Sequence, residues 1–203
     1  MPQKLPWNKG KLVGQKAPFR PRDVQTIKQL LENAGNLRDL ALFSVGIDTM
    51  LRGIDLLALR VDDVMDHRGA IVEQFSIGQR KTGKTTVVAF LPYSQRVLHG
   101  WIAASGKLPW HYLFTGVRQN KDRPITTNQY RRLVKGWATS AKLDPHHFST
   151  HSLRRTKAAC VYQQPHNVEA VRQLLGQSSL TATAAYLGID QQAALEIARQ
   201  FAL

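Results

Sequence analysis

Two residues in the second half of the chain combine a cation with a group that can carry a proton. His151 and Arg154 stand three positions apart, so on a helix their side chains would share one face. An arginine can hold two phosphate oxygens at once, and a histidine can transfer a proton near neutral pH. The pair therefore suits chemistry on a phosphate, although a solvated helix start would contain the same residues about as well.

Arg52 lies between an apolar helix and a short apolar segment, next to the flexible Gly53. This placement favours an arginine that points inward, and Asp55, three residues further on, stands where it would orient the guanidinium. The alternative is an ordinary surface pair of Arg52 and Asp55, which would contribute little to stability. The residues around this pair leave both interpretations open.

Two lysines and a tyrosine complete the set of reactive side chains. Lys81 and Lys84 lie in a polar turn between two strand-like runs, where a lysine either delivers a proton or is merely solvated. Tyr186 follows a segment in which Gly176 ends one helix and a serine begins the next. A tyrosine at this place is either a nucleophile or a part of the core.

Positive charge dominates the chain of 203 residues, with 28 Lys and Arg against 14 Asp and Glu and a formal net charge of +14. Asp122 and Asp144 are the only acids between Gln74 and Val168, a stretch rich in lysine and arginine. Such a field attracts polyanions, chiefly because phosphates release their counterions on binding. The charge therefore favours nucleic acid as the partner, over a charge that only keeps the protein in solution.

The remaining composition is that of a soluble globular protein, with 43% hydrophobic residues. No apolar run reaches the roughly 18 residues of a membrane-spanning helix. Cys160 is the only cysteine, so no internal disulfide can form and a reducing cytoplasm is the expected compartment. No cysteine or acidic cluster completes a metal site with His146, His147 and His151, and no Gly-rich phosphate loop indicates a nucleotide, so no cofactor is expected.

The spacing of apolar residues predicts a mainly α-helical chain with a small antiparallel β-sheet. Residues 1–20 form a basic arm, which Trp7 and Phe19 would pin to the body, and residues 21–203 form one domain. Helices are predicted over residues 23–34, 36–49 (capped by Asn36), 54–59, 94–104, 126–142, 152–162, 167–175, 180–186 and 191–201, and strands over residues 70–77 and 85–91.

Together and in this order, the reactive segments closely resemble those of the tyrosine recombinase family, also called the phage integrase family. That family carries a Leu-Arg-x-x-Glu/Asp-Leu segment, a lysine on a β-hairpin turn, a His-x-x-Arg segment and a Leu-Gly-His-Ser-Ser segment before its tyrosine. The matching residues are, in chain order, Arg52 with Asp55, Lys81, His151 with Arg154, and Ser178 and Ser179 before Tyr186. The resemblance covers about residues 20–190 and implies the catalytic-domain fold of the family.

The resemblance also implies a site-specific recombinase or integrase that breaks and rejoins double-stranded DNA through a 3′-phosphotyrosine link to Tyr186. In that scheme Arg52 and Arg154 stabilise charge on the phosphate, His151 takes up a proton, and Lys81 protonates the departing oxygen. Relatives commonly exchange C-terminal helices within a DNA-bound tetramer. A homotetramer formed through the last predicted helix is therefore expected, in a cytoplasmic, nucleoid-associated protein, the alternative being that this helix docks on its own core.

Gln177 departs from the family pattern, because it stands where relatives carry a second histidine or a tryptophan. Its amide can still donate to a phosphate oxygen, although it cannot titrate, so Gln177 is kept among the catalytic residues. Many relatives also carry a separate N-terminal helical domain, where this chain has only the basic arm. In length the chain is similar to the short recombinases that invert fimbrial promoters.

The helix predicted over residues 126–142 is the candidate for contact with a DNA groove. The residues expected to touch DNA are Lys84, Gln129, Arg131, Arg132, Lys135 and Arg155. Two alternative functions stay open. One is a topoisomerase of the same chemistry, and the other is a DNA-binding regulator with reduced catalysis, which the amide at Gln177 favours.

Overall fold

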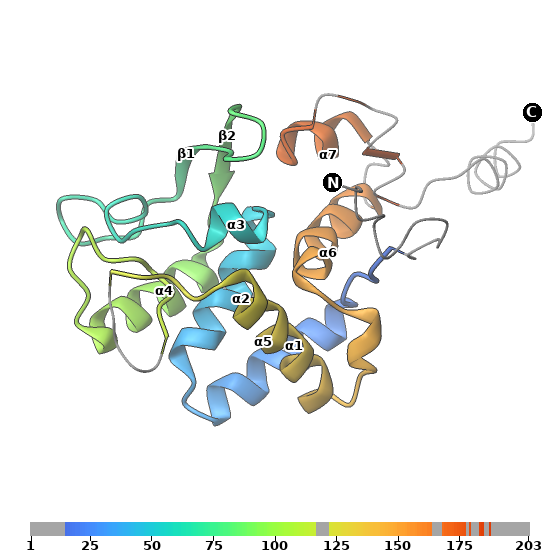
Figure 1. Cartoon of the computed structure of the whole chain (residues 1–203), viewed down its shortest axis with the longest axis horizontal. Helices are drawn as coiled ribbons and strands as arrows, with labels where there is room; N and C mark the ends of the chain where they lie inside the picture. The colour runs from blue at the N-terminus through green and yellow to red at the C-terminus, as the bar shows by residue number, and fades with distance from the viewer. Residues whose placement is uncertain are drawn as a thin grey trace, which may run out of the picture.

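The computed structural model describes residues 15–116, 122–163 and 168–177, together with residues 179, 183, 184 and 187. Its elements are α1 (Pro21–Asn33), α2 (Leu37–Thr49), α3 (Gly53–Leu56), β1 (Gln74–Gly78), β2 (Thr85–Ala89), α4 (Pro92–Ser105), α5 (Thr127–Ser140), the 3-10 helix η1 (Pro145–His147), α6 (Thr150–Gln163) and α7 (Val168–Leu174). This part of the chain is mainly helical with a two-stranded antiparallel sheet, which confirms the predicted α+β class (Figure 1).

Helix α2 is the central element of the domain and packs against α1, α4 and α6 (Figure 1). All of its residues from Asp39 to Thr49 are buried. The side chain of Asn36 accepts a hydrogen bond from the backbone N–H of Asp39, as its predicted role of N-cap requires. The helix ends at Met50, whose φ of 49° is left-handed and turns the chain toward Arg52.

Tyr130 of α5 fixes the place where α2 and α3 meet. Its ring is buried, and its hydroxyl lies so close to Gly46 that a Cβ there would stand 2.8 Å from the oxygen. The same ring covers Gly53, where a Cβ would be in ordinary contact at 3.4 Å. A glycine in the middle of α2 therefore lets α5 approach and holds the start of α3, next to Arg52, against the core.

Aromatic side chains join the first described residues to the helical body. Phe19 is 2% exposed and stacks on Phe148 with ring centroids 4.3 Å apart, while its edge meets Phe43 of α2. The backbone N–H of Phe19 donates to the hydroxyl of Thr156 on α6. Phe19 thus pins the chain as predicted, whereas Trp7 and the rest of the arm up to residue 14 lie outside the described residues.

Strands β1 and β2 form a hairpin whose inner face carries Phe75 and Ile77 on one strand and Thr86 and Val88 on the other. Strand β1 begins four residues later than predicted. The carboxyl group of Asp66 accepts from two backbone N–H groups in a turn, and Ile71 after this turn forms an isolated bridge with Met65 instead of joining the ladder with β2.

The helices predicted over residues 180–186 and 191–201 lie mostly or wholly outside the described residues. Across the part that is described, none of the helices combines the length and the apolar character needed to cross a membrane.

Candidate active site

Arg52 occupies the turn between α2 and α3 and is half-buried. The left-handed residue Met50 sends the chain out of α2, and Arg52 then stands at the N-cap of α3 with extended backbone. Its guanidinium donates to the side-chain oxygen of Gln79, at the base of the hairpin turn. The inward direction predicted for Arg52 is therefore what the structure has.

Arg154 lies inside the protein, with only 4% of its surface exposed. One terminal nitrogen donates to the carbonyl oxygen of Met50 at 2.6 Å, and the other donates to the carbonyl oxygen of Leu175 at 2.7 Å. These two carbonyls belong to the end of α2 and to the residue after α7. A single guanidinium thus connects α6, which carries it, to the ends of two other helices.

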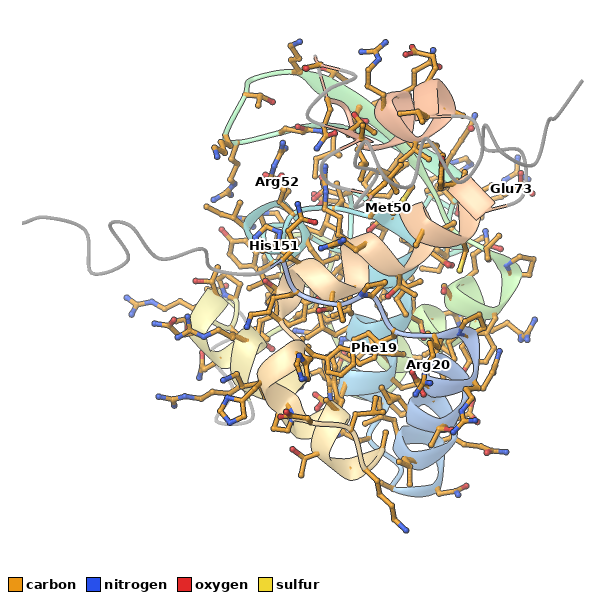
Figure 2. The ribbon with its side chains drawn as sticks, turned by 90° about the vertical axis from the view of Figure 1, so that its right-hand side faces the viewer. Phe19, Arg20, Met50, Arg52, Glu73 and His151 are labelled. Carbon is orange, nitrogen blue, oxygen red and sulfur yellow. The ribbon has the colours of Figure 1, made fainter. Side chains whose placement is uncertain are left out.

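His151 is exposed and lies one helical turn before Arg154 on α6. Partial desolvation lowers the pKa of the imidazole, and the positive charges of Arg154, Arg52, Lys81 and Arg155, in that order, lower it further. In Figure 2 the side chains of Arg52 and His151 lie next to each other on one side of the protein. His151 and Arg154 therefore lie on one helix, and the positive charges of Arg52 and Lys81 are close enough to lower the pKa of the imidazole.

Lys81 is exposed within the turn that joins β1 and β2. The turn is closed by a hydrogen bond from the N–H of Gln79 to the carbonyl of Lys84 at 2.9 Å, and Gly83 adopts a φ of 67°. Lys84 is exposed in the same turn. Of the two lysines, Lys81 is the one whose charge acts on His151.

Asp55 does not orient Arg52, contrary to the expectation from sequence. Asp55 is 1% exposed, and its carboxyl group accepts a hydrogen bond from the backbone N–H of Arg80 at 2.9 Å. The guanidinium of Arg52 is instead held by Gln79. The reason is geometric, since the hairpin turn lies over α3 and brings a backbone donor to the carboxyl group while Arg52 extends toward the turn.

Gln177 follows the turn after α7, and its side-chain oxygen accepts a hydrogen bond from the hydroxyl of Thr183 at 2.6 Å. Arg172 donates to its backbone carbonyl at 2.7 Å. Gln177 is thus held from both sides, close in the chain to Leu175, which Arg154 binds. Tyr186 and Ser178 lie outside the described residues, and Ser179 is exposed.

The predicted DNA-contact residues on α5 lie on its outer face. Its buried side carries Tyr130, Val134, Trp137 and Ala138, so that Arg131, Arg132 and Lys135 are exposed. The side chain of Gln129 turns back to cap the helix, where it accepts from the N–H of Thr126 at 2.8 Å. Its carboxamide oxygen is therefore used within the helix rather than turned toward a ligand.

Arg155 has a structural contact that its sequence position did not indicate. Its guanidinium donates to the carbonyl oxygen of Lys16 at 2.9 Å and so ties residues 15–19 to α6. The contact lies next to the hydrogen bond between Phe19 and Thr156. Arg155 therefore contributes both charge near His151 and an anchor for the start of the described chain.

Gln79 is the site residue that sequence reasoning missed, because it was assigned to a solvated turn. It is 2% exposed, and its side chain contacts Arg52, Thr82 and Leu175. The alternation of strand β1 gives the signal that was available, since Phe75, Ile77 and Gln79 are spaced by two. Continuing the strand's inward face by one step predicts that Gln79 points inward.

Comparison with known proteins matches residues 19–193 to the phage integrase family. The probable integrase/recombinase YoeC of Bacillus subtilis is 32% identical over 170 residues, which are 83% of this chain and 86% of that protein. Tyrosine recombinase XerC of Corynebacterium efficiens is 30% identical over 168 residues, which cover 80% of this chain but only half of that protein.

Among solved structures, the XerH site-specific recombinase bound to difH substrate superposes with a TM-score of 0.71 at 20% identity, over 93% of this chain and 55% of that one. The structural similarity supports the assignment of the fold, and the sequence matches show the family. The chain belongs to the phage integrase family.

Proposed function

We propose that this protein is a site-specific recombinase that cleaves and rejoins double-stranded DNA through a covalent link between Tyr186 and a 3′ phosphate. One observation carries the proposal most directly. Arg52 and Arg154 come from separate parts of the chain, yet Arg154 binds the carbonyl oxygen of Met50, two residues before Arg52, and lies one helical turn from His151 on α6. The family supports the same reading, because its members YoeC and XerC are named as recombinases.

In the proposed cleavage step the phenolic oxygen of Tyr186 attacks the phosphorus, and the bond to the 5′ oxygen breaks. His151 takes the phenolic proton, and Lys81 gives a proton to the 5′ oxygen, so that a free 5′ hydroxyl leaves. The new phosphodiester with tyrosine keeps the energy of the broken bond. Attack by a 5′ hydroxyl of another strand reverses each transfer and rejoins the DNA, without a metal or a nucleotide.

Arg52 and Arg154 are proposed to stabilise negative charge on the phosphate in the transition state. Negative charge grows on the non-bridging oxygens during attack, and fixed cations near these oxygens stabilise it. Arg154 is held by two carbonyl oxygens and Arg52 by Gln79, so neither guanidinium has to be ordered when the phosphate arrives. Gln177 would add an amide donor to the same oxygens, in place of the histidine that relatives carry.

His151 suits the role of proton acceptor in the free enzyme. Desolvation and the surrounding cations keep its pKa below the usual value, so the imidazole is neutral at pH 7 and can accept a proton. A DNA phosphate entering the site would bring negative charge next to it and would raise its pKa again. The proton affinity of His151 would therefore increase when the substrate is in place.

Exchange of strands requires several protomers on paired sites. We expect a homotetramer on DNA, formed through the segment Gln191–Phe201, which lies outside the described residues. A recombinase that acts on chromosomal or plasmid DNA would be associated with the nucleoid. Deletion of residues 191–203 should then impair the pairing of two sites more than the binding of one.

Covalent capture on nicked DNA tests the chemistry. A pool of nicked duplexes with randomised sequence around the nick lets the short 5′ fragment diffuse away, so that cleavage becomes irreversible and the protein stays attached. Wild-type protein should form an adduct that survives denaturation, and Tyr186→Phe should form none while binding DNA with similar affinity. Tyr112→Phe is the matched control, because it removes a phenolic hydroxyl from a tyrosine whose ring packs under Arg60.

Two results would contradict the proposal. An adduct that persists in Tyr186→Phe removes this tyrosine from the role of nucleophile. A wild-type protein that binds the pool and forms no adduct with any member points instead to a regulator without catalysis.

A further inference from the structure

The side chain of Gln79 connects two of the proposed catalytic segments. Its oxygen accepts hydrogen bonds from the guanidinium of Arg52 and from the hydroxyl of Thr82, the latter at 3.1 Å. Its nitrogen donates to the carbonyl oxygen of Leu175 at 3.4 Å. With 2% of its surface exposed, Gln79 makes these contacts inside the protein, where polar groups are held by partners and not by water.

The carbonyl oxygen of Leu175 also binds Arg154, so the two arginines are joined through Gln79. Arg52 donates to Gln79, Gln79 donates to Leu175, and Leu175 accepts from Arg154. Arg154 then donates to the carbonyl of Met50, two residues before Arg52 in the chain. The hydrogen bonds and residues 50–52 form a closed ring, which fixes the position of one guanidinium relative to the other.

Gly176 leaves the space that the amide of Gln79 fills. Its φ of 59° is left-handed, and a Cβ at this position would stand 2.4 Å from the side-chain nitrogen of Gln79. Any other residue at 176 would push the amide away from Leu175. The approach of Gln79 to the end of α7 is therefore built into the turn itself.

Gln79 is also fixed through its backbone to the turn that carries Lys81. Its N–H donates to the carbonyl of Lys84, and its own carbonyl accepts from the N–H groups of Thr82 and Gly83 at 3.2 and 2.8 Å. The side chain that holds Arg52 and the turn that carries Lys81 thus belong to one hydrogen-bonded turn.

We propose that Gln79 is a positioning residue of the recombinase, which sets the guanidinium of Arg52 at a fixed place relative to Arg154 and to the turn of Lys81. The assignment rests on the proposed cleavage chemistry for its effect on rate. The amide of Gln79 meets both demands at this place, because its oxygen accepts from a cation and its nitrogen donates to a carbonyl. Glutamate would repel the carbonyl of Leu175, and methionine would bind neither partner.

The first test is made on the protein without DNA and does not depend on catalysis. Gln79→Met keeps the volume of the side chain but removes its hydrogen bonds, so that Arg52 is released toward solvent. The pKa of His151 should then rise toward its ordinary value, because one of the cations that lowers it moves away while Arg154, Lys81 and Arg155 stay. NMR titration measures this, with the His151 signal assigned by its loss in His151→Gln.

Gln74→Met is the matched control for this titration, since Gln74 is an exposed glutamine on β1, the strand that leads to Gln79. It should leave the titration of His151 as in the wild type. If Gln79→Met also leaves it unchanged, Gln79 does not set the place of Arg52 and the inference is overturned.

The second test measures the rate of covalent capture on the pool of nicked duplexes. Gln79→Met should slow capture by roughly 10- to 100-fold with little change in DNA affinity, as expected for a displaced catalytic group. In an Arg52→Lys background the same change should cost much less, because the group that Gln79 positions is already altered. A general loss of stability would slow both backgrounds by the same factor.

Gln79→Asn replaces Gln79→Met in both tests if the methionine variant fails to fold. Its shorter side chain keeps an amide but cannot reach Arg52 and Leu175 together. The outcomes of the two tests distinguish a wrong positioning role from a wrong cleavage chemistry. A wild-type rate of capture in both Gln79 variants refutes the positioning role while the cleavage chemistry stands. An absence of capture in the wild type, together with a shifted His151 titration in Gln79→Met, refutes the chemistry and retains the link between Gln79 and Arg52.

Discussion

Asp55 holds the hairpin turn in place by accepting a hydrogen bond from the backbone N–H of Arg80 at 2.9 Å. The second oxygen of this buried carboxyl group has no hydrogen-bond partner among the described residues. The first oxygen thus makes the hydrogen bond that joins α3 to the turn of Lys81. An asparagine can supply the same acceptor without a carboxyl group, whereas an alanine cannot.

Asp55→Ala should therefore slow cleavage more than Asp55→Asn. The alanine variant leaves the N–H of Arg80 without its partner, which costs about 1–3 kcal/mol if the group stays buried, and it loosens the turn that presents Lys81. Capture should be compared on ordinary DNA and on DNA with a sulfur in place of the 5′ oxygen, which leaves without a proton. The sulfur substrate should restore most of the rate in Asp55→Ala. Equal loss on both substrates would mean that Asp55 acts on the fold and not on Lys81.

Arg154→Met should lower the free energy of unfolding as well as the rate of cleavage. The variant removes both donors from a buried site, and the carbonyl of Met50 loses its contact with the guanidinium. We expect a loss of about 1–3 kcal/mol in urea unfolding, the usual cost of a buried group without its partner. Arg131→Met on the exposed face of α5 is the control and should change stability by less than ~0.5 kcal/mol. Equal stability of the two variants would show that Arg154 is dispensable for the fold.

Gly46→Ala should destabilise the protein, although alanine favours helices. The added methyl group would stand 2.8 Å from the hydroxyl of Tyr130 and 3.0 Å from a methyl carbon of Leu153, so α5 must shift away from α2. Overpacking of this kind costs about 1–3 kcal/mol. Gly136→Ala in α5 meets nothing within 4 Å and should stabilise by about 0.5–1 kcal/mol. Thermal unfolding of the two variants in opposite directions supports the contact, and stabilisation by both refutes it.

The types and spacing of residues were enough to predict that Arg52 points inward and that Asn36 caps α2. They could not identify the partners of Arg52 and Asp55. The choice between Gln79 and Asp55 as partner depends on how the hairpin lies over α3, which is a distance in space that local spacing does not contain. The same holds for Arg155, whose contact with Lys16 joins residues 139 positions apart. The nucleophile assigned to Tyr186 stays a prediction, because that residue lies outside the described part.

His151 should make stability depend on pH on the acidic side. Its pKa in the folded protein lies below the ordinary value of 6.5, so the unfolded chain binds a proton first as the pH falls. The stability contributed by neutral His151 is therefore present above pH 6.5, decreases as the pH drops below it, and stops decreasing once the folded pKa is passed. Urea unfolding of wild type and His151→Gln at several pH values isolates this effect as a difference. A difference that does not vary between pH 7 and pH 5 would show that neither desolvation nor the surrounding cations lower the pKa of His151 in the folded protein.

The exposed cations of α5 should make DNA binding sensitive to salt. Arg132 and Lys135 project from the face of the helix opposite to the buried Tyr130 and Val134, so they are placed to meet phosphates and not to stabilise the core. Loss of one phosphate contact reduces the slope of log K against log salt by about 0.9 and weakens binding to all sequences alike. The alanine variants of Arg132 and Lys135 should each show this change when binding to the same duplex is titrated at several salt concentrations.

Arg60→Ala is the control of equal charge, because its guanidinium lies over the ring of Tyr112 at 4.4 Å and is engaged within the protein. If Arg60→Ala changes the slope as much as Lys135→Ala does, the effect comes from net charge, and α5 has no special role in binding DNA.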